Sequence, residues 1–506
     1  MPYNLVTTRE ERRPMKSIAF QTEFRPELPV VFGAKDYREF RASIEEIDHF
    51  LTATGIEHRL LVAHMMSAEN ACPENPRQKA YERLRQALRY SILLALTGLS
   101  HRGLSHRVAD SSLFQWFTHT AEIDGVRPSS KSSIERFEKL FSAEEITQLI
   151  HACNQAVASP LGAQELLCAE TPLMFDAIFA DTTCVKSNIH FPVDWVLLRD
   201  ATRTLIKAIA LIRAQGLKHR MGDPKKFLRD MNKLCIEMTH VRKKKGAKKM
   251  RKAIFRRMKR LMKTVENHAG NYYHLLESRW EETDWSQSQT QVILDRMQNI
   301  LDQLPQAVHQ AHERLIGERR VANKDKILSF YEPDAHVLLR GKADAEVEFG
   351  NGFYLAEQAD GLIVDWQFIK VQPASDHKLV ADSLESLTKI YGRPQSYSGD
   401  RGFDAPGNRE ALAEKNIANG ICPRSVVQLK ERLDDPCFRQ LQTRRGSTEA
   451  RISIFKNAYL GIPLRSKGFD HRKTRIEWCV LAHNLWKLAR IAVQNREAAV
   501  ERKEAA

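Results

Sequence analysis

The chain has 506 residues and the composition of an ordinary soluble protein, with 42% hydrophobic and 28% charged residues and a formal net charge of +15. Its length predicts two to four domains. The longest apolar runs are too short to cross a bilayer and the N-terminus lacks a signal-type apolar segment, which argues against a membrane or secreted protein. Eight cysteines without a C-x-x-C pair argue against a disulfide framework or a zinc knuckle and indicate reduced thiols in a cytoplasmic protein.

The N-terminal third of the chain is predicted to be helical. Residues 1–38 carry several prolines and no clear helical period, so we expect a loosely ordered arm there. In residues 39–169 apolar side chains recur at helical spacing, with breaks expected at Gly98 and Gly103. Two short helices around the sequence SHRG resemble a small DNA-reading unit, and compact helical packing without a DNA role explains the pattern equally well.

The pattern changes in LMFDAIFADTTCVKS, where a short apolar run ends on Asp181 and is followed by threonines. This pattern predicts a strand that delivers a carboxylate to its C-terminal end. Asp194 is then expected to cap a helix that begins near Trp195. We assign residues 170–199 to the first part of a sheet-containing domain.

Residues 200–322 show helical periodicity and no strand signal, which predicts an all-helical insertion. Within it, residues 242–263 hold thirteen Lys and Arg and no acid, so this segment supplies most of the net charge. An amphipathic helix of this kind suits a phosphate backbone, while an anionic lipid surface and a plain solvated face are the alternatives. The candidate DNA contacts of this segment are Arg242, Lys243, Lys244, Lys245, Lys248, Lys249, Arg251, Lys252, Arg256 and Arg257.

Strand patterns resume in residues 344–372, where three glycines punctuate an expected hairpin pair. A helix follows with Ser375 as its predicted cap and Gly392 as its end. A second short strand then ends on Asp400, followed by another helix. With residues 323–495 as its second part, the domain has the strand and helix order of an RNase H-like mixed sheet with flanking helices, once the helical insertion after its first strand is set aside.

The sequence TRRGSTEARISIFK places a single acid, Glu449, among four cations. If the segment is a helix, Arg445 lies four residues before Glu449 and Lys456 lies seven after it, so the three side chains share one face. An exposed ion pair on a solvated helix is the simplest explanation of such a segment. Two acids at strand ends change that interpretation.

Asp181, Asp400 and Glu449 together form the oxygen-rich ligand set that hard divalent cations prefer. A pair of Mg2+ ions held by such carboxylates can activate an attacking hydroxyl and stabilise the leaving oxygen of a phosphodiester. We therefore expect a site for two Mg2+ ions, with Mn2+ able to substitute. Each acid alone is a weak signal, because Asp is common at strand ends and in turns.

These blocks resemble the bacterial insertion-sequence transposases with a DDE catalytic domain, of the type with a Y-R-E-K signature. Arg445, Glu449 and Lys456 match that signature, and its tyrosine falls on Gln442. ADTTCVKSNIHFPVDWVLL and SGDRGFDAPGN are similar to the first-acid and second-acid blocks of the family. The resemblance covers residues 80–490, and its specificity lies in three blocks that occur in the right order.

The resemblance implies an RNase H-like catalytic domain that cleaves DNA at the ends of an insertion sequence to give a 3′ hydroxyl and joins that end to target DNA. It makes Asp181, Asp400 and Glu449 the catalytic metal ligands, and Arg445 and Lys456 contacts to the phosphates beside the scissile bond. The implied partners are the terminal inverted repeats and the target DNA, bound by a dimer or higher assembly. The implied location is the bacterial cytoplasm, at the nucleoid.

Two other functions are consistent with the same residues. A transposase-derived DNA-binding protein without catalysis would be expected to have lost one of the acids, and none is missing. A nuclease would use the same site to cut without joining. The expected organisation is thus an arm, a helical DNA-binding domain, a two-part catalytic domain around a basic helical insertion, and a short tail at residues 496–506.

Overall fold

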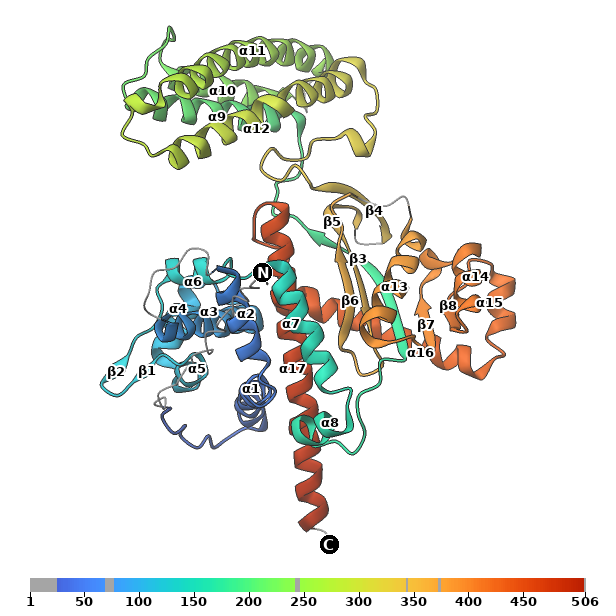
Figure 1. Ribbon diagram of the computed structural model, residues 1–506. Coiled ribbons are helices and arrows are strands. Elements are labelled where there is room, and N and C mark those ends of the chain that lie inside the picture. The colour runs from blue at the N-terminus through green and yellow to red at the C-terminus, as the bar shows by residue number, and fades with distance from the viewer. Residues whose placement is uncertain (1–24, 69–76, 242–245, 343–344, 372–374, 505–506) are drawn as a thin grey trace, which may run out of the picture. The chain divides into compact units, whose positions relative to one another are not determined.

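The chain forms two compact units, comprising Met1–Leu173 with Val480–Ala506, here called the N-terminal unit, and Met174–Cys479, here called the central unit. None of the helices in the described part of the chain is both long and apolar enough to span a membrane. The computed structural model describes residues 25–68, 77–241, 246–342, 345–371 and 375–504 (Figure 1).

The described residues of the N-terminal unit are mainly helical, as predicted. A short hairpin separates two of the helices and was not predicted. Its two strands, β1 (Ala121–Glu122) and β2 (Gly125–Val126), have two residues each. A break at Gly98 was expected and is present, whereas Gly103 lies inside a helix and ends nothing. The helices are α1 (Lys35–Ala53), α2 (Ile56–Ala68), α3 (Arg77–Thr97), α4 (His101–Asp110), α5 (Ser112–Thr118), α6 (Lys131–Phe137), α7 (Ala143–Ala156) and α8 (Pro160–Leu167).

A buried arginine organises the core of the N-terminal unit. The side chain of Arg89 on α3 is fully buried, and its guanidinium donates two bonds of 2.8 Å to Glu57 of α2 and another to Asp48 of α1. The same guanidinium lies 5.1 Å from the ring centre of Phe117. Because a buried charge is costly unless it is paired, this network fixes how the first three helices pack.

The closing helix, α17 (Phe469–Glu504), contributes to both units. Its residues from Val480 onward pack within the N-terminal unit, where Asn484 donates to the side-chain oxygen of Asn154 at 3.1 Å and Asn495 to the Leu167 carbonyl at 2.9 Å. The catalytic domain expected to extend to residue 495 therefore differs from the compact unit, which ends at Cys479.

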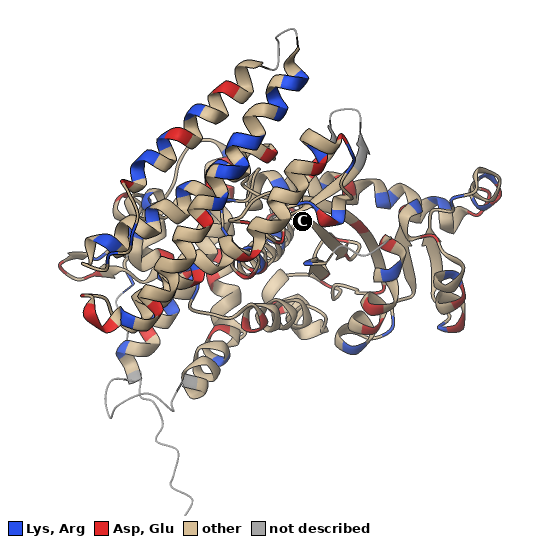
Figure 2. Cartoon of the chain, turned by 90° about the horizontal axis from the view of Figure 1, so that it is seen from above, with Lys and Arg blue, Asp and Glu red and all other residues tan. Residues whose placement is uncertain are grey.

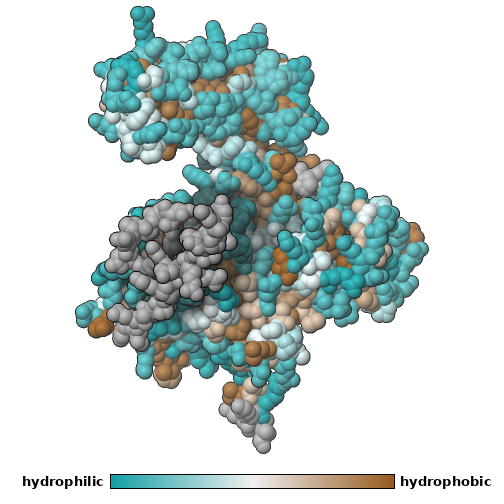
Figure 3. Space-filling view, in the orientation of Figure 1, coloured by the Kyte–Doolittle hydropathy of each residue, from teal (hydrophilic) through white to brown (hydrophobic). Residues whose placement is uncertain are grey.

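The segment predicted as a helical insertion forms a bundle (Figure 1). Buried apolar side chains from all four of its long helices, among them Ile209, Met238, Phe255 and Leu304, make one core. Its visible surface is mainly hydrophilic (Figure 3). The long helices are α9 (Asp194–Ala214), α10 (Pro224–Val241), α11 (Ala247–Arg279) and α12 (Gln287–His312), and a π-helical turn, η3 (Glu313–Gly317), follows them.

The two ends of the bundle are joined by a polar clasp centred on Asp194. The prediction that Asp194 caps α9 is wrong, because the N-cap position falls on Val193. Instead, the buried Asp194 carboxylate accepts bonds from Gln310 Nε2 at 2.8 Å and Arg314 Nη1 at 2.9 Å, both at the end of the bundle. The Gln310 side-chain oxygen in turn accepts the backbone N–H of Ile327 at 2.8 Å.

The central unit also contains a mixed six-stranded sheet. In the order β4-β5-β3-β7-β8, β3 is antiparallel to β5 and parallel to β7, and β7 is parallel to β8. Both β4 and β6 pair with β5, along its first and last parts. The predicted hairpin pair is thus a three-stranded meander whose first strand the sequence did not reveal. The strands are β3 (Ala177–Lys186), β4 (His336–Lys342), β5 (Ala345–Glu357), β6 (Ile363–Phe368), β7 (Ser396–Gly399) and β8 (Ala418–Ile421).

Helices flank this sheet, which makes the central unit mixed α/β, as the pattern predicted. Ile178 and Ala180 of β3 share one buried cluster with Leu384 of α13. Gly392 ends that helix as predicted, whereas the side chain of Ser375 makes no capping bond. The helices are α13 (Leu379–Tyr391), α14 (Pro406–Glu414), α15 (Val426–Arg432) and α16 (Pro436–Ile454), which continues into a π-helical turn, η7 (Phe455–Leu460).

Candidate functional site

The candidate site is built on the alternation of side chains along β3, because neighbouring residues of a strand face opposite sides of a sheet. Phe179, Asp181 and Thr183 face α16 and η7. The guanidinium of Arg444 lies 4.6 Å from the ring centre of Phe179, and Lys456 Nζ donates to Thr183 Oγ1 at 3.2 Å. The helical segment therefore follows the strand, with Asp181 between these two contacts.

A buried carboxylate sets the rotation of α16. The side chain of Glu357, at the end of β5, is fully buried and pairs with Arg444 Nη1 at 2.9 Å and with Arg451 Nε at 2.5 Å. Thr448 Oγ1 donates to the same carboxylate at 2.9 Å. These three partners lie on one face of α16, so two of the four cations around Glu449 serve the sheet and do not pair with Glu449.

Gly361 belongs to this anchor. A Cβ at this position would overlap the guanidinium of Arg451, and φ is +92°, a backbone conformation that glycine adopts readily. The turn between β5 and β6 therefore provides the space that the Arg451 side chain occupies. Arg444 is held in the same region by the carbonyl of Ala359, which accepts its Nε–H at 2.9 Å.

Asp181 is the electrostatic centre of the candidate site. The pKa of Asp181 is raised to about 6, first by burial and then by the negative charges of Asp400 and Glu449. The backbone N–H of Thr182, which donates to Asp181 Oδ1 at 2.7 Å, and the charge of Arg445 lower the pKa. Two acids that are far apart in the sequence, Asp400 and Glu449, thus act on the carboxyl group of Asp181.

Asp400 lies just after β7, where the strand prediction placed it. Its carboxylate caps the short turn that follows, accepting the N–H of Gly402 at 2.8 Å. A further acid that the sequence analysis did not identify, Asp376, accepts the hydroxyl proton of Thr182 at 2.7 Å. A Cβ added at Gly402 would lie 2.9 Å from Asp400 Oδ1 and 3.3 Å from Asp376 Oδ2, so both carboxylates approach this glycine. Asp376 thus binds the strand that carries Asp181 and lies close to the loop that carries Asp400.

Glu449 forms an ion pair with Arg445, with 3.3 Å between Oε1 and Nη1. Its side chain is 65% exposed, whereas that of Arg445 is only 19% exposed. Gln442 holds the arginine from the other side, since its Oε1 accepts Arg445 Nε–H at 3.2 Å and its Nε2 donates to the Gly420 carbonyl of β8 at 2.5 Å. Gln442 therefore positions Arg445 from the place where the signature has a tyrosine.

The donor chemistry of Asp181, Asp400 and Glu449 fits a hard divalent cation, because all three supply carboxylate oxygens. A bound cation would also relieve the electrostatic repulsion that Asp400 and Glu449 exert on Asp181. Their positions do not form a complete ligand set, however. Within the described part of the chain, no group of three or more His, Cys, Asp or Glu lies close enough to hold a metal ion, and Glu449 is turned to Arg445.

The candidate DNA contacts of the basic segment differ in their surroundings. Arg242, Lys243, Lys244 and Lys245 lie outside the described residues. Lys248 and Lys252 pair with Glu318 at 2.5 and 2.9 Å, and Arg251 lies 5.3 Å from the ring centre of Trp195. Lys249 and Arg256 are exposed, and Lys and Arg recur along the long helices of the bundle (Figure 2).

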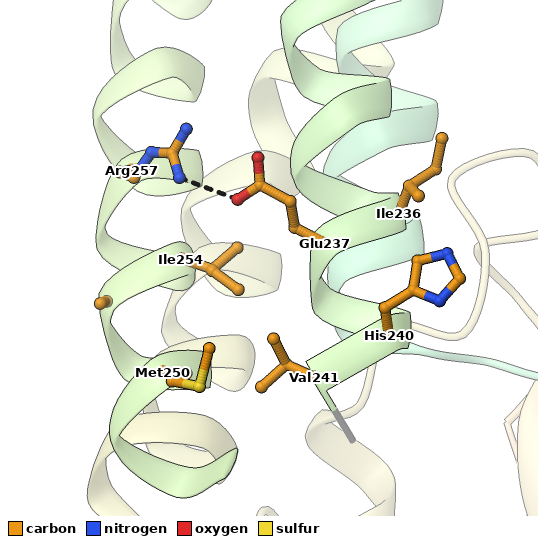
Figure 4. Close-up of a pocket in the computed structure, with 8 residues that line it drawn as sticks. Ile236, Glu237, His240, Val241, Met250, Ile254 and Arg257 are labelled. Carbon is orange, nitrogen blue, oxygen red and sulfur yellow. Dashed lines mark hydrogen bonds and ion pairs between the residues drawn. The ribbon is translucent and has the colours of Figure 1, made fainter. Parts of the chain in front are cut away.

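Arg257 borders an open hollow of about 710 Å3 between α10 and α11. Figure 4 shows its guanidinium and the Glu237 carboxylate pointing toward one another, with 2.8 Å between Nη1 and Oε2. Val241 and Ile254 line the apolar part of the hollow. The Arg257 charge is thus neutralised within the bundle, which leaves Lys249 and Arg256 as the expected contacts with the clearest access to a ligand.

Comparison of the chain with protein-family models, with curated proteins and with solved structures found no match.

Proposed function

We propose that the central unit is an RNase H-like catalytic domain of the DDE transposase type, which cleaves and joins DNA by metal-dependent phosphoryl transfer. The strand order supports the fold, because a central strand pairs antiparallel with a meander on one side and parallel with two strands on the other. The single observation that carries the proposal is the convergence of charge from Asp400, Glu449 and Arg445 on Asp181.

The residues of the chain have separate roles in this proposal. Asp181, Asp400 and Glu449 would hold two Mg2+ or Mn2+ ions, which when bound would supply a polarised attacking hydroxyl and charge stabilisation at the leaving oxygen. Arg445 binds a phosphate of the cut strand by two parallel bonds, and Lys456 binds a second phosphate as a point charge. Buried Glu357 keeps the helix that carries these groups in register.

DNA is the proposed partner because its phosphates match the exposed cations of the bundle. Lys249 and Arg256 lie on the face of α11 opposite the apolar side that enters the core. Contacts of this kind bind without regard to base sequence and weaken with salt. We assign the terminal inverted repeats and the target DNA to this partner class, with two or more copies of the chain bringing the ends together in the bacterial cytoplasm.

The proposal is tested with the DNA that flanks the coding region, incubated with the protein and Mg2+ or Mn2+. We expect cleavage and joining to a target plasmid, and loss of both in Asp181→Asn, Asp400→Asn and Glu449→Gln with binding retained. Asp382→Asn, which removes an exposed acid from α13, is the matched control and should remain active.

The outcome separates three functions. Cleavage without joined product identifies a nuclease, and binding without cleavage identifies a catalytically silent DNA-binding protein. Full activity in all three acid variants would remove the proposed site, because each of the acids is assigned a part in the same reaction.

A further inference from the structure

A second hollow, of about 540 Å3, lies at the end of the bundle where the chain leaves η3. Four cations line it, namely Arg314, Arg319, Arg320 and Lys326. Its size is in the range of sites that take a small polar group or part of a larger ligand.

Three acids near this hollow already pair with cations. Glu313 pairs with Arg319, with 2.8 Å between Oε1 and Nη2. Asp194 accepts Arg314 in the clasp at 2.9 Å, and Glu318 is bound by two lysines of α11. Glu318, which lines the hollow, and the neighbouring Glu313 and Asp194 therefore each have at least one cationic partner.

Positive charge is left over after this pairing. In the described part of the chain neither Arg320 nor Lys326 forms an ion pair with a carboxylate, and Lys326 Nζ donates to the side-chain oxygen of Asn323 at 2.6 Å. Burial lowers the pKa of Lys326, and the neighbouring charge of Arg314 lowers it further. An anion in the hollow would relieve this repulsion between cations.

We infer that this hollow is a phosphate-binding site formed by Arg320 and Lys326 with support from Arg314 and Arg319. Guanidinium groups present parallel donors that match phosphate oxygens, and lysine adds a compact charge. The hollow lies beside the first turn of α11, because Glu318 at its edge binds Lys248 and Lys252. A strand of DNA on the exposed face of α11 can therefore place a backbone phosphate there, and a free diphosphate offers the same chemistry.

The test uses the full chain in EDTA, so that cleavage is absent and the result is independent of the proposed metal site. Arg320→Gln with Lys326→Gln is compared with Lys233→Gln with Arg296→Gln, which removes two exposed bundle cations outside the hollow. Binding of a labelled duplex of arbitrary sequence is measured by fluorescence anisotropy across a salt series. Binding of inorganic pyrophosphate is measured by calorimetry.

We expect the hollow variant to lose about tenfold or more in duplex affinity near 0.1 M salt, and its salt slope to fall by about 1.8, which corresponds to two lost phosphate contacts. The control pair should lose clearly less. A selective loss for pyrophosphate alone would support the same site with a free phosphate as its ligand. Equal losses in the hollow and control variants for both probes would overturn the inference, because only net charge would then matter.

Thermal unfolding of both double variants is the control that they are folded when their DNA affinities are compared. All four side chains are exposed or only half-buried, so neither change should lower the midpoint by more than a few degrees. Failure of the strand-transfer test leaves this measurement intact, since duplex binding in EDTA requires no catalysis. Failure of the binding test equally leaves the three acids and their reaction untouched.

Discussion

Replacing Glu357 with glutamine should destabilise the central unit, although it exchanges only one side-chain oxygen for an amide. The buried carboxylate accepts hydrogen bonds from Arg444 and Thr448 and forms an ion pair with Arg451. An amide retains one acceptor oxygen and turns its NH2 group toward a guanidinium. Loss of charge from one partner of a buried ion pair typically costs about 3 to 5 kcal/mol, and we expect about 3 because both arginines are partly exposed.

The assay is thermal unfolding followed by tryptophan fluorescence, since Trp366 and Trp478 lie in the same unit. For the roughly 300 residues of the central unit, Met174–Cys479, a loss of about 3 kcal/mol corresponds to a midpoint lower by roughly 5 °C. Glu449→Gln is the matched control, because it neutralises an exposed glutamate on α16 that pairs with an arginine at 3.3 Å. Exposed pairs contribute about 0–1 kcal/mol, so this variant should unfold almost with the wild type.

Similar midpoints for the two variants would refute the reasoning that Glu357 anchors α16. We expect the order of the two variants in activity to be the opposite of their order in stability. Glu449→Gln should be inactive and stable, whereas Glu357→Gln should keep partial strand transfer at low temperature. If Glu357 and Glu449 both formed only surface ion pairs, the two variants would differ neither in stability nor in activity.

Three further changes test other parts of the site. Gly361→Ala should cost about 2–4 kcal/mol because its Cβ meets a held guanidinium, whereas Gly392→Ala, with a similar positive φ but open space around it, should cost about 1, measured by urea unfolding. In metal-free buffer Asp181→Asn should be about 2–3 kcal/mol more stable than the wild type at pH 7.5 and equal to it at pH 4. Gln442→Leu should slow strand transfer about fivefold with little change in stability, because Arg445 loses a hydrogen bond worth about 1 kcal/mol.

The sign of the pH effect follows from the folded-state pKa of Asp181, about 6, against an ordinary value of 3.8. The folded protein holds this proton more tightly than the unfolded chain, so the free energy of unfolding falls as pH rises between those values and stays lower above them. Equal stabilities at pH 7.5 would contradict this, as equal costs at the two glycines would contradict the contact at Gly361. Unchanged strand transfer in Gln442→Leu would show that Arg445 is held without it.

The sequence patterns predicted several features of the central unit that depend on residues close together in the chain. The apolar run before Asp181 is a buried strand, the glycine after α13 ends the helix, and the acid after β7 lies in its turn. The expectation that the strand ends at Asp181 is wrong, because β3 continues to Lys186 through its pairing with β5 and Asp181 lies in its middle. The strand His336–Lys342 was missed because an edge strand gains most of its stability from pairing with β5, which the local pattern does not report. Asp194 failed as a cap because two partners more than a hundred residues away bind its carboxylate.

The supports of the candidate site were hidden from the sequence for the same reason. Glu357 is an unremarkable glutamate at a strand end until a helix from about ninety residues later brings its cations to it. Gln442 appeared only as a departure from a signature, and its two hydrogen bonds show how the arginine is held. The proposed ligands could be named from motif order, whereas the ion pair that turns Glu449 to Arg445 depends on side-chain positions.

The clasp at Asp194 bears on how the protein is made. The central strand β3 leaves the ribosome about 160 residues before its partner β5, and closing so long a flexible loop carries an entropic cost. If the bundle folds first, its helices form from local contacts and the clasp brings Asp194 next to Ile327. The effective loop between the two strands then shrinks to short connections, so the bundle would act as an internal folding aid for the sheet.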